Sequence, residues 1–312
     1  MKKMATILLC LLVLFMVARV VLKTPIGKQK VVDFTPSKKE CGSVPEFAGL
    51  RYCVHLPLSG APNGDIAYVL HGKDQNELMW NYEYLYGALV QKYWEQNRIV
   101  PPTVVSISFG PVWLLSPKGT LPDSGLMDLF VDRVIPMIES KIGKPQNRLV
   151  FGASMGGMNS LSLGLLHGNL FKRVGAVCPV MYMETPYSNL SEMKTFLQST
   201  GAEPYNIMIA IALSRRYFSN KDEWDQFAPL SLINRENIQY NTKFYLSGAL
   251  YDEWGVFRAE ETFVEKAQAK GVSVEWHPQF GPHCVVDVGT LAEFLVADHR
   301  IVRELKKITA QK

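Results

Sequence analysis

A serine flanked by glycines is the first candidate for chemistry in this chain of 312 residues. Gly152-Ala153-Ser154-Met155-Gly156 forms a G-x-S-x-G pentapeptide, with a short apolar run before it and a helix-compatible segment after it. This pattern is typical of a nucleophile elbow, a sharp strand-to-helix turn that exposes one serine hydroxyl above a sheet. Bulky residues in place of the two glycines would collide with the adjoining strand and helix. The alternative is a glycine-rich turn in which Ser154 only caps a helix.

A serine nucleophile needs a base to accept its proton and an acid to orient that base. With such an elbow, the acid and then the histidine follow the serine along the chain, each on a loop after a strand. The sequence supplies this order with Asp252 and His283, so we predict Ser154, Asp252 and His283 as catalytic residues. Two alternatives stay open, namely Glu253 as the acid and His277 as the base.

The oxyanion formed when serine attacks a carbonyl carbon needs two N–H donors. We predict the main-chain amide of Met155, directly after the serine, as one donor. For the second we predict the amide of Lys73, in the loop after an early strand, with the amide of Gly72 as the alternative. His71 in the same loop is interpreted as a structural residue rather than a second catalytic histidine.

Three large apolar side chains could line a pocket for the acyl group of a substrate. Trp113 and Leu114 follow the end of a predicted strand, and Trp254 lies beside Asp252 in the sequence. The alternative for each of the three is an ordinary place in the core.

Predicted strands and helices alternate along the chain. This alternation predicts an α/β fold with a mainly parallel sheet covered by helices on both faces. A turn at 62–65 between the first two strands suggests that these pair as a hairpin. Between 182 and 241 the alternation lapses, and we expect a lid-like helical insertion there. Strands are predicted at 50–56, 66–70, 103–109, 149–152, 174–178, 243–246 and 272–276, and helices at 77–95, 123–142, 155–167, 257–270 and 288–305.

The first 23 residues differ from the rest of the chain. Two lysines precede an uncharged apolar run, which is typical of an export signal. Residues 4–22 could instead be retained as a membrane tether. We therefore predict a signal peptide or anchor at 1–23, a polar linker at 24–42 and one catalytic domain at 43–312. The expected location is periplasmic, extracellular or membrane-anchored facing outward.

The cysteines bear on the same question of compartment. Cys41 and Cys53 could form a disulfide in an oxidising compartment, and so could Cys178 and Cys284 near one sheet edge. Buried free thiols are the alternative in both cases. The sequence has no C-x-x-C pair, which argues against a zinc site. The net charge of +4 is small, and the scattered basic residues argue against a nucleic-acid partner.

With these motifs in this order, the chain resembles the putative-esterase branch of the α/β hydrolases, which includes esterase D-like, feruloyl esterase, siderophore esterase and mycolyltransferase-type enzymes. The resemblance spans about residues 43–310. It implies the α/β-hydrolase fold, the triad of Ser154, Asp252 and His283, the amides of Lys73 and Met155 as oxyanion donors, and no metal or organic cofactor. The matching segments are 68–72, 129–139, 152–157 and 167–171, together with those around Asp252 and His283.

The expected function is hydrolysis of a carboxylic ester through an acyl-serine intermediate. The expected substrate is a small-molecule or glycan-linked ester, but Cys178 and the insertion depart from the family pattern, so its identity does not carry over. One alternative is an acyltransferase, which uses the same triad. Another is a catalytically inactive binding module with the same fold.

Overall fold

The computed structural model describes residues 32–58, 60–119, 121–235, 241–297 and 299. The predicted signal or anchor at 1–23 lies outside these residues. Within the described part, no helix combines the length and the apolar character needed to cross a membrane. The described residues from Asp33 onward belong to one compact unit.

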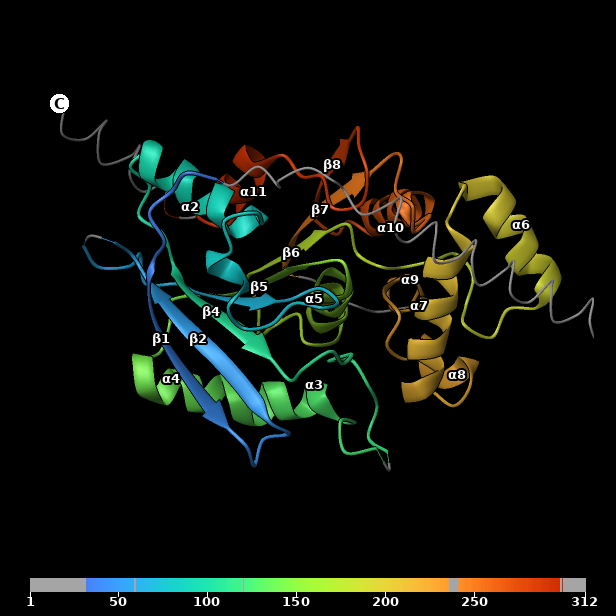
Figure 1. Ribbon diagram of the computed structural model, residues 1–312, viewed down its shortest axis with the longest axis horizontal. Helices are drawn as coiled ribbons and strands as arrows, with labels where there is room; N and C mark the ends of the chain where they lie inside the picture. The colour runs from blue at the N-terminus through green and yellow to red at the C-terminus, as the bar shows by residue number, and fades with distance from the viewer. Residues whose placement is uncertain (1–31, 59, 120, 236–240, 298, 300–312) are drawn as a thin grey trace, which may run out of the picture. The chain divides into compact units, whose positions relative to one another are not determined.

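Eight strands form a single, mainly parallel sheet (Figure 1). They are β1 (Lys38–Val44), β2 (Leu50–Leu56), β3 (Ile66–Leu70), β4 (Thr103–Ser108), β5 (Arg148–Ala153), β6 (Arg173–Val177), β7 (Lys243–Ala249) and β8 (Val274–Gln279). Their order across the sheet is β1-β2-β4-β3-β5-β6-β7-β8. The first three strands in this order pair antiparallel, and every later pair is parallel. The predicted fold class is therefore confirmed.

Helices cover both faces of the sheet, and β3 illustrates why. All five of its residues are buried, with Tyr68 and Leu70 in one core and Ala67 and Val69 in the other. The first core contains α3 (Leu126–Leu129), α4 (Ile135–Ile142), α5 (Met155–Leu166) and α10 (Phe257–Ala269). The second contains a 3-10 turn (Met79–Asn81), α2 (Tyr86–Gln96) and α11 (Val288–Phe294). A π-helical turn (Phe130–Val134) joins α3 and α4.

The predicted hairpin between β2 and β3 is wrong. The two strands run in opposite directions, as the turn suggested, but β4 lies between them and pairs with both. A strand that is apolar along its whole length, as β3 is, suits the interior of a parallel sheet better than a hairpin near the edge.

Other expectations also differ from the structure in their bounds: the helix predicted at 77–95 is a 3-10 turn followed by α2, and the strand predicted at 272–276 is β8 at Val274–Gln279. Strand β1 covers residues 38–42 of the predicted linker. Its lysines interrupt any apolar alternation, so the sequence pattern does not predict it as a strand. Charged side chains are nevertheless common on edge strands, where they discourage pairing with another chain. The helix predicted at 288–305 begins as expected and ends at Phe294, while 300–305 lie outside the described residues.

Along the chain, four helices of the described residues separate β6 from β7, within the range predicted as an insertion (Figure 1). The first begins at a capping box, in which Asn189 accepts hydrogen bonds from the amides of Ser191 and Glu192. It ends at Gly201, which adopts a left-handed conformation. The four are α6 (Leu190–Thr200), α7 (Pro204–Tyr217), α8 (Lys221–Asp225) and α9 (Pro229–Leu232).

Candidate active site

Ser154 stands between β5 and α5 in a strained main-chain conformation, with φ 56° and ψ −119°. A non-glycine residue at positive φ costs on the order of 1–3 kcal/mol and persists only where its surroundings impose it. Here the Ser154 N–H donates to the Val177 carbonyl at 2.9 Å. A Cβ atom on Gly152 or Gly156 would lie 2.4 or 2.0 Å from the Leu70 carbonyl oxygen, so both flanking positions require glycine. Ser154 thus has the strand-to-helix geometry that the pentapeptide predicts.

The structure brings His283 and Asp252 to this serine. Nδ1 of His283 lies 2.6 Å from Oδ2 of Asp252, and Nε2 lies 3.0 Å from the Ser154 hydroxyl oxygen. Because a carboxylate only accepts, Nδ1 carries the proton and Nε2 is left to accept from the serine. The Asp252 side chain is 0% exposed, and its other oxygen, Oδ1, accepts a hydrogen bond from the main-chain N–H of Trp254 at 2.8 Å. This arrangement can move a proton from Ser154 to His283.

The loop that carries His283 is tied to the sheet by a disulfide. Cys284, the next residue, is bonded to Cys178, which follows β6. Both cysteines have positive φ, 66° and 42°. A second disulfide joins Cys41 and Cys53 across β1 and β2. Both pairings that the sequence left open are therefore present.

The loop after β3 lies beside the serine, as a Cβ on Gly72 would be only 3.5 Å from the Ser154 Cβ. The Gly72 N–H donates to the side chain of Gln75 at 3.1 Å, so it is already engaged. Lys73 follows in the same loop, and its side chain pairs with Asp74. Met155 is the first residue of α5, where main-chain N–H groups have no acceptor within the helix. Because the Gly72 amide already donates to Gln75, the Lys73 amide is the better candidate for the second oxyanion donor.

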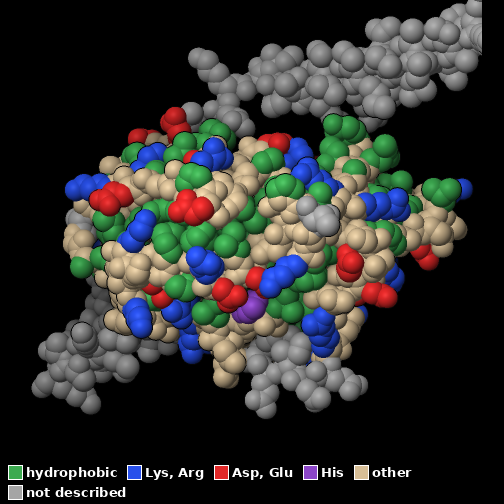
Figure 2. All heavy atoms as spheres, turned by 90° about the horizontal axis from the view of Figure 1, so that it is seen from below, with side chains coloured by type: hydrophobic (Ala, Val, Ile, Leu, Met, Phe, Trp, Pro, Cys, Tyr) green, Lys and Arg blue, Asp and Glu red, His purple; other side chains and the backbone are tan. Residues whose placement is uncertain are grey.

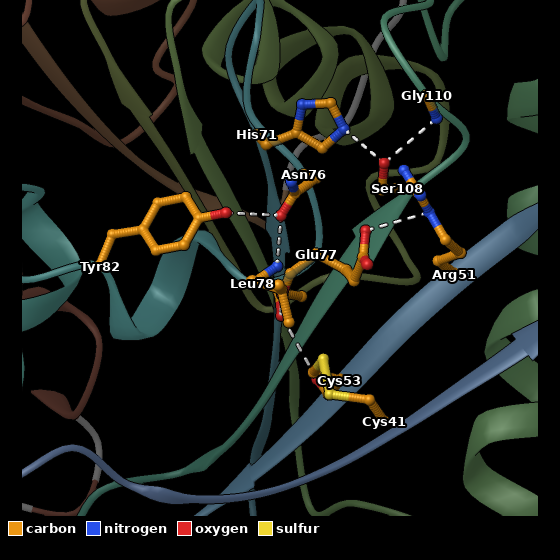
Figure 3. Close-up of polar contacts among 11 residues, drawn as sticks. Cys41, Arg51, Cys53, His71, Asn76, Glu77, Leu78, Tyr82, Ser108 and Gly110 are labelled. Carbon is orange, nitrogen blue, oxygen red and sulfur yellow. Dashed lines mark hydrogen bonds and ion pairs between the residues drawn. A yellow bond between two sulfur atoms is a disulfide. The ribbon is translucent and has the colours of Figure 1, made fainter.

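His71 shapes this loop (Figure 3). Its Nδ1 lies 2.7 Å from the Gly72 carbonyl oxygen, and its Nε2 lies 3.0 Å from the hydroxyl of Ser108 at the end of β4. That hydroxyl also accepts the Gly110 N–H at 3.1 Å. Burial lowers the pKa of His71 and so favours the neutral ring, in which Nδ1–H donates to the Gly72 carbonyl and Nε2 accepts from Ser108. These contacts give His71 a structural place in the loop.

The three candidates for the acyl pocket and the alternative base His277 lie in different parts of the structure. Trp254 lies beside His283, with ring centroids 5.7 Å apart. Trp113 and Leu114 are only 3% and 4% exposed and belong to the buried core that also contains α5. His277 stacks on Tyr245 within the sheet, with ring centroids 4.7 Å apart.

One group of side chains in the described part has the spacing of metal ligands, namely Cys178, His283 and Cys284. The two sulfur atoms are bonded to each other, so neither is the thiolate that a metal binds.

The surface carries charges of both signs. Figure 2 shows basic and acidic side chains interspersed over the face that it presents.

Comparison with known proteins identifies the family. The sequence model described as Putative esterase matches residues 51–246. The chain belongs to this family. It is therefore an esterase, a carboxylic ester hydrolase, as the sequence predicted. The matched range contains Lys73, Ser154 and Met155 but ends before Asp252 and His283. No curated protein matches the sequence significantly.

Solved structures of several esterases share the fold at low sequence identity. A ferulic acid esterase is 17% identical with a TM-score of 0.57, covering 84% of this chain and 96% of its own. An arylesterase is 16% identical with a TM-score of 0.59, covering 92% and 95%. An S-formylglutathione hydrolase from Agrobacterium tumefaciens is 13% identical with a TM-score of 0.55, covering 87% and 96%. At such identities the likeness extends to the fold alone.

Three contacts around the site are not predicted by the sequence. Gln75 binds the Gly72 amide, Ser108 binds the His71 ring, and Glu253 binds the main chain of His283 rather than its ring. Glu253 and His283 are 30 residues apart in the sequence, and no motif links them. Only the meeting of two loops in the fold reveals such a pair.

Proposed function

We propose that this esterase hydrolyses carboxylic esters through a covalent acyl-Ser154 intermediate. The observation that carries the proposal is the chain of hydrogen bonds from Ser154 through His283 to Asp252, at 3.0 and 2.6 Å. A buried carboxylate beside the ring stabilises the imidazolium that forms when histidine accepts a proton. Asp252 has this position, whereas Glu253 contacts the main chain.

The reaction proceeds in two halves. His283 Nε2 takes the proton of Ser154 as the hydroxyl oxygen attacks the ester carbonyl carbon, and it then gives this proton to the departing alcohol. Water next attacks the acyl-serine with His283 Nε2 as base, and His283 then returns this proton to the Ser154 oxygen as the bond to the acyl group breaks and the acid is released. The amides of Met155 and Lys73 stabilise the oxyanion in both halves.

The substrate that we propose is a small ester, either free or linked to a glycan, with Trp254 beside its acyl group. Solved relatives named as a ferulic acid esterase and an arylesterase motivate a panel that varies aromatic character and acyl length. Added glycerol or sugar acceptors in the same assay separate hydrolysis from acyl transfer, because a transferase would yield the new ester at the expense of free acid.

Labelling with a fluorophosphonate tests the nucleophile. We expect the wild-type protein to be labelled and to hydrolyse a p-nitrophenyl ester, and Ser154→Ala to do neither. Ser160→Ala is a matched control, because that buried serine only donates to the Gly156 carbonyl in α5. Labelling or hydrolysis that survives Ser154→Ala would refute the assignment.

We further propose that the protein is exported, with residues 1–23 as a signal peptide or retained anchor. The basic and apolar N-terminal pattern and the two disulfides support this location. Mass spectrometry of the protein from fractionated cells would identify the mature N-terminus. A full-length cytoplasmic protein with reduced cysteines would contradict export.

A further inference from the structure

The carboxylate next to the proposed triad acid holds the same histidine by a different atom. Glu253 Oε2 accepts a hydrogen bond from the main-chain N–H of His283, with an N···O distance of 3.1 Å. Asp252 accepts from the ring of His283 at 2.6 Å. Two consecutive carboxylates thus bind one residue, the first at its side chain and the second at its backbone.

Glu253 is itself anchored to the helical insertion. Its carbonyl oxygen accepts the N–H of Glu203, just before α7, at 2.9 Å, and the side-chain amide of Asn206 at 3.4 Å. A Cβ atom on Gly255 would lie 2.7 Å from the Cβ of Ala202, so the turn after Glu253 packs directly on the same part of the insertion. The carboxylate therefore projects from a backbone that is held in place.

The loop that carries His283 has fixed points on both sides of the histidine. Before it, the N–H groups of Leu250 and Tyr251 donate to the carbonyls of Gln279 and Gly281 at 2.9 and 3.2 Å. After it, Cys284 is held by the disulfide. Between these points, the hydrogen bond to Glu253 is the only one among the described residues that holds the main-chain N–H of His283 itself.

We propose that Glu253 is a positioning residue, whose carboxylate fixes the main chain of His283 so that Nε2 stays within reach of the Ser154 hydroxyl. This inference rests on the proposed function of the triad. Hydrogen bonds from N–H to a carboxylate are among the stronger ones in proteins. A displacement of about 1 Å at a reacting group can lower the rate roughly a hundredfold. Glu253 thus acts through His283 and touches neither the substrate nor the reacting atoms.

Three substitutions at Glu253 separate positioning from a role of its charge. Glu253→Gln keeps an oxygen acceptor at the same reach without the charge, Glu253→Asp keeps the charge but withdraws the acceptor by one methylene, and Glu253→Ala removes both. We expect kcat for Gln to stay within about twofold of wild type, and kcat for Asp and Ala to fall about tenfold or more, with KM little changed in each. Wild-type kcat in all three variants would overturn the proposal. So would a higher kcat for Asp than for Gln, since that order indicates charge.

Controls keep these outcomes interpretable. Glu275→Ala removes an exposed carboxylate of β8 that lies near His277, and it should leave kcat unchanged. Thermal unfolding of each variant identifies loss of fold. If Glu253→Ala does not fold, the order of Gln and Asp still decides, because both keep a polar side chain of similar size. Ser154→Ala in the same assay tests the proposed function separately, since hydrolysis by that variant would reject the triad whatever the order at Glu253.

Discussion

At the scale of single residues, the elbow depends on the absence of side chains at Gly152 and Gly156, two residues before and two after Ser154. Its conformation is strained, and the Leu70 carbonyl lies where a side chain on either flanking glycine would be. The spacing of the two glycines was visible in the sequence, but their common neighbour was not, because β3 is far from them along the chain.

We predict that Gly156→Ala destabilises the fold and abolishes activity. The new methyl carbon would lie 2.0 Å from the Leu70 carbonyl oxygen, a main-chain atom that cannot move aside cheaply. Overpacking of this kind costs about 1–3 kcal/mol or more, measured as the free energy of unfolding in urea. Gly119→Ala is the matched control, because its nearest atom is 3.7 Å away. Equal stabilities of the two variants would contradict the steric explanation.

We predict that Asp252→Asn lowers kcat roughly 10³- to 10⁴-fold, as the loss of an orienting carboxylate does in other serine hydrolases. The amide no longer favours the tautomer of His283 that carries its proton on Nδ1. Steady-state kinetics on a soluble ester would measure the effect, with Glu253→Gln as the neighbouring control. A similar loss in both variants would argue that the two carboxylates share the role of acid.

Glu260 gives a pH dependence with a definite sign. It lies on α10 with 0% exposure, and neither carboxyl oxygen has a hydrogen-bond partner in the described part of the chain. Burial, followed by the charge of Asp252, raises its pKa well above 4.5. Above pH 4.5 the Glu260 carboxyl group has lost its proton in the unfolded chain, whereas the same group in the folded protein still holds it. Stability therefore falls as pH rises, by up to about 1.4 kcal/mol per pH unit, until the buried group ionises.

We predict that Glu260→Gln, which does not titrate, gains stability relative to wild type as pH increases. Urea unfolding of both proteins between about pH 5 and about pH 8 would measure the difference in the free energy of unfolding. A constant difference across this range would mean that the proton of Glu260 does not distinguish the folded from the unfolded state.

At the scale of elements, the sequence was most informative where strands are apolar and continuous, as in β3 and β5. It was least informative about which strands are neighbours. The wrong hairpin between β2 and β3 arose because a turn reports a reversal of direction, whereas pairing depends on where β4 is inserted. Strand β1 lacked an apolar signal because it is an exposed edge held partly by a disulfide.

The two disulfides should differ in their effect on catalysis. Replacing Cys178 and Cys284 by alanine frees the loop of His283, so we predict at least a tenfold lower kcat. Replacing Cys41 and Cys53 should leave kcat unchanged, because that bridge joins β1 to β2 at the other end of the strand order.

Both double variants should also lose stability. Their cysteines are 106 and 12 residues apart. Loop-closure entropy then predicts losses of about 5 and about 3 kcal/mol in the free energy of unfolding. Kinetics and urea unfolding on the same samples would separate the two effects. An equal fall in kcat for both pairs would show that the bridge beside His283 has no special part in catalysis.

At the scale of the whole molecule, the candidate site assembles from loops that follow different parallel strands. Ser154 follows β5, Asp252 follows β7, His283 follows β8, and the Lys73 loop follows β3. Parallel strands bring their carboxyl ends to one edge of a sheet, which is why the order of motifs along the sequence predicted a common site. The link between the insertion and His283 through Glu253 required the three-dimensional fold.

We expect Ser154 to carry the acyl group during hydrolysis. Rapid acid quenching of the wild-type enzyme with a slowly hydrolysed ester, followed by peptide mass spectrometry, tests it most directly. We predict that the peptide containing Ser154 gains the mass of the acyl group, and that this adduct disappears as product forms. An adduct on another residue, or steady hydrolysis by Ser154→Ala, would contradict the claim.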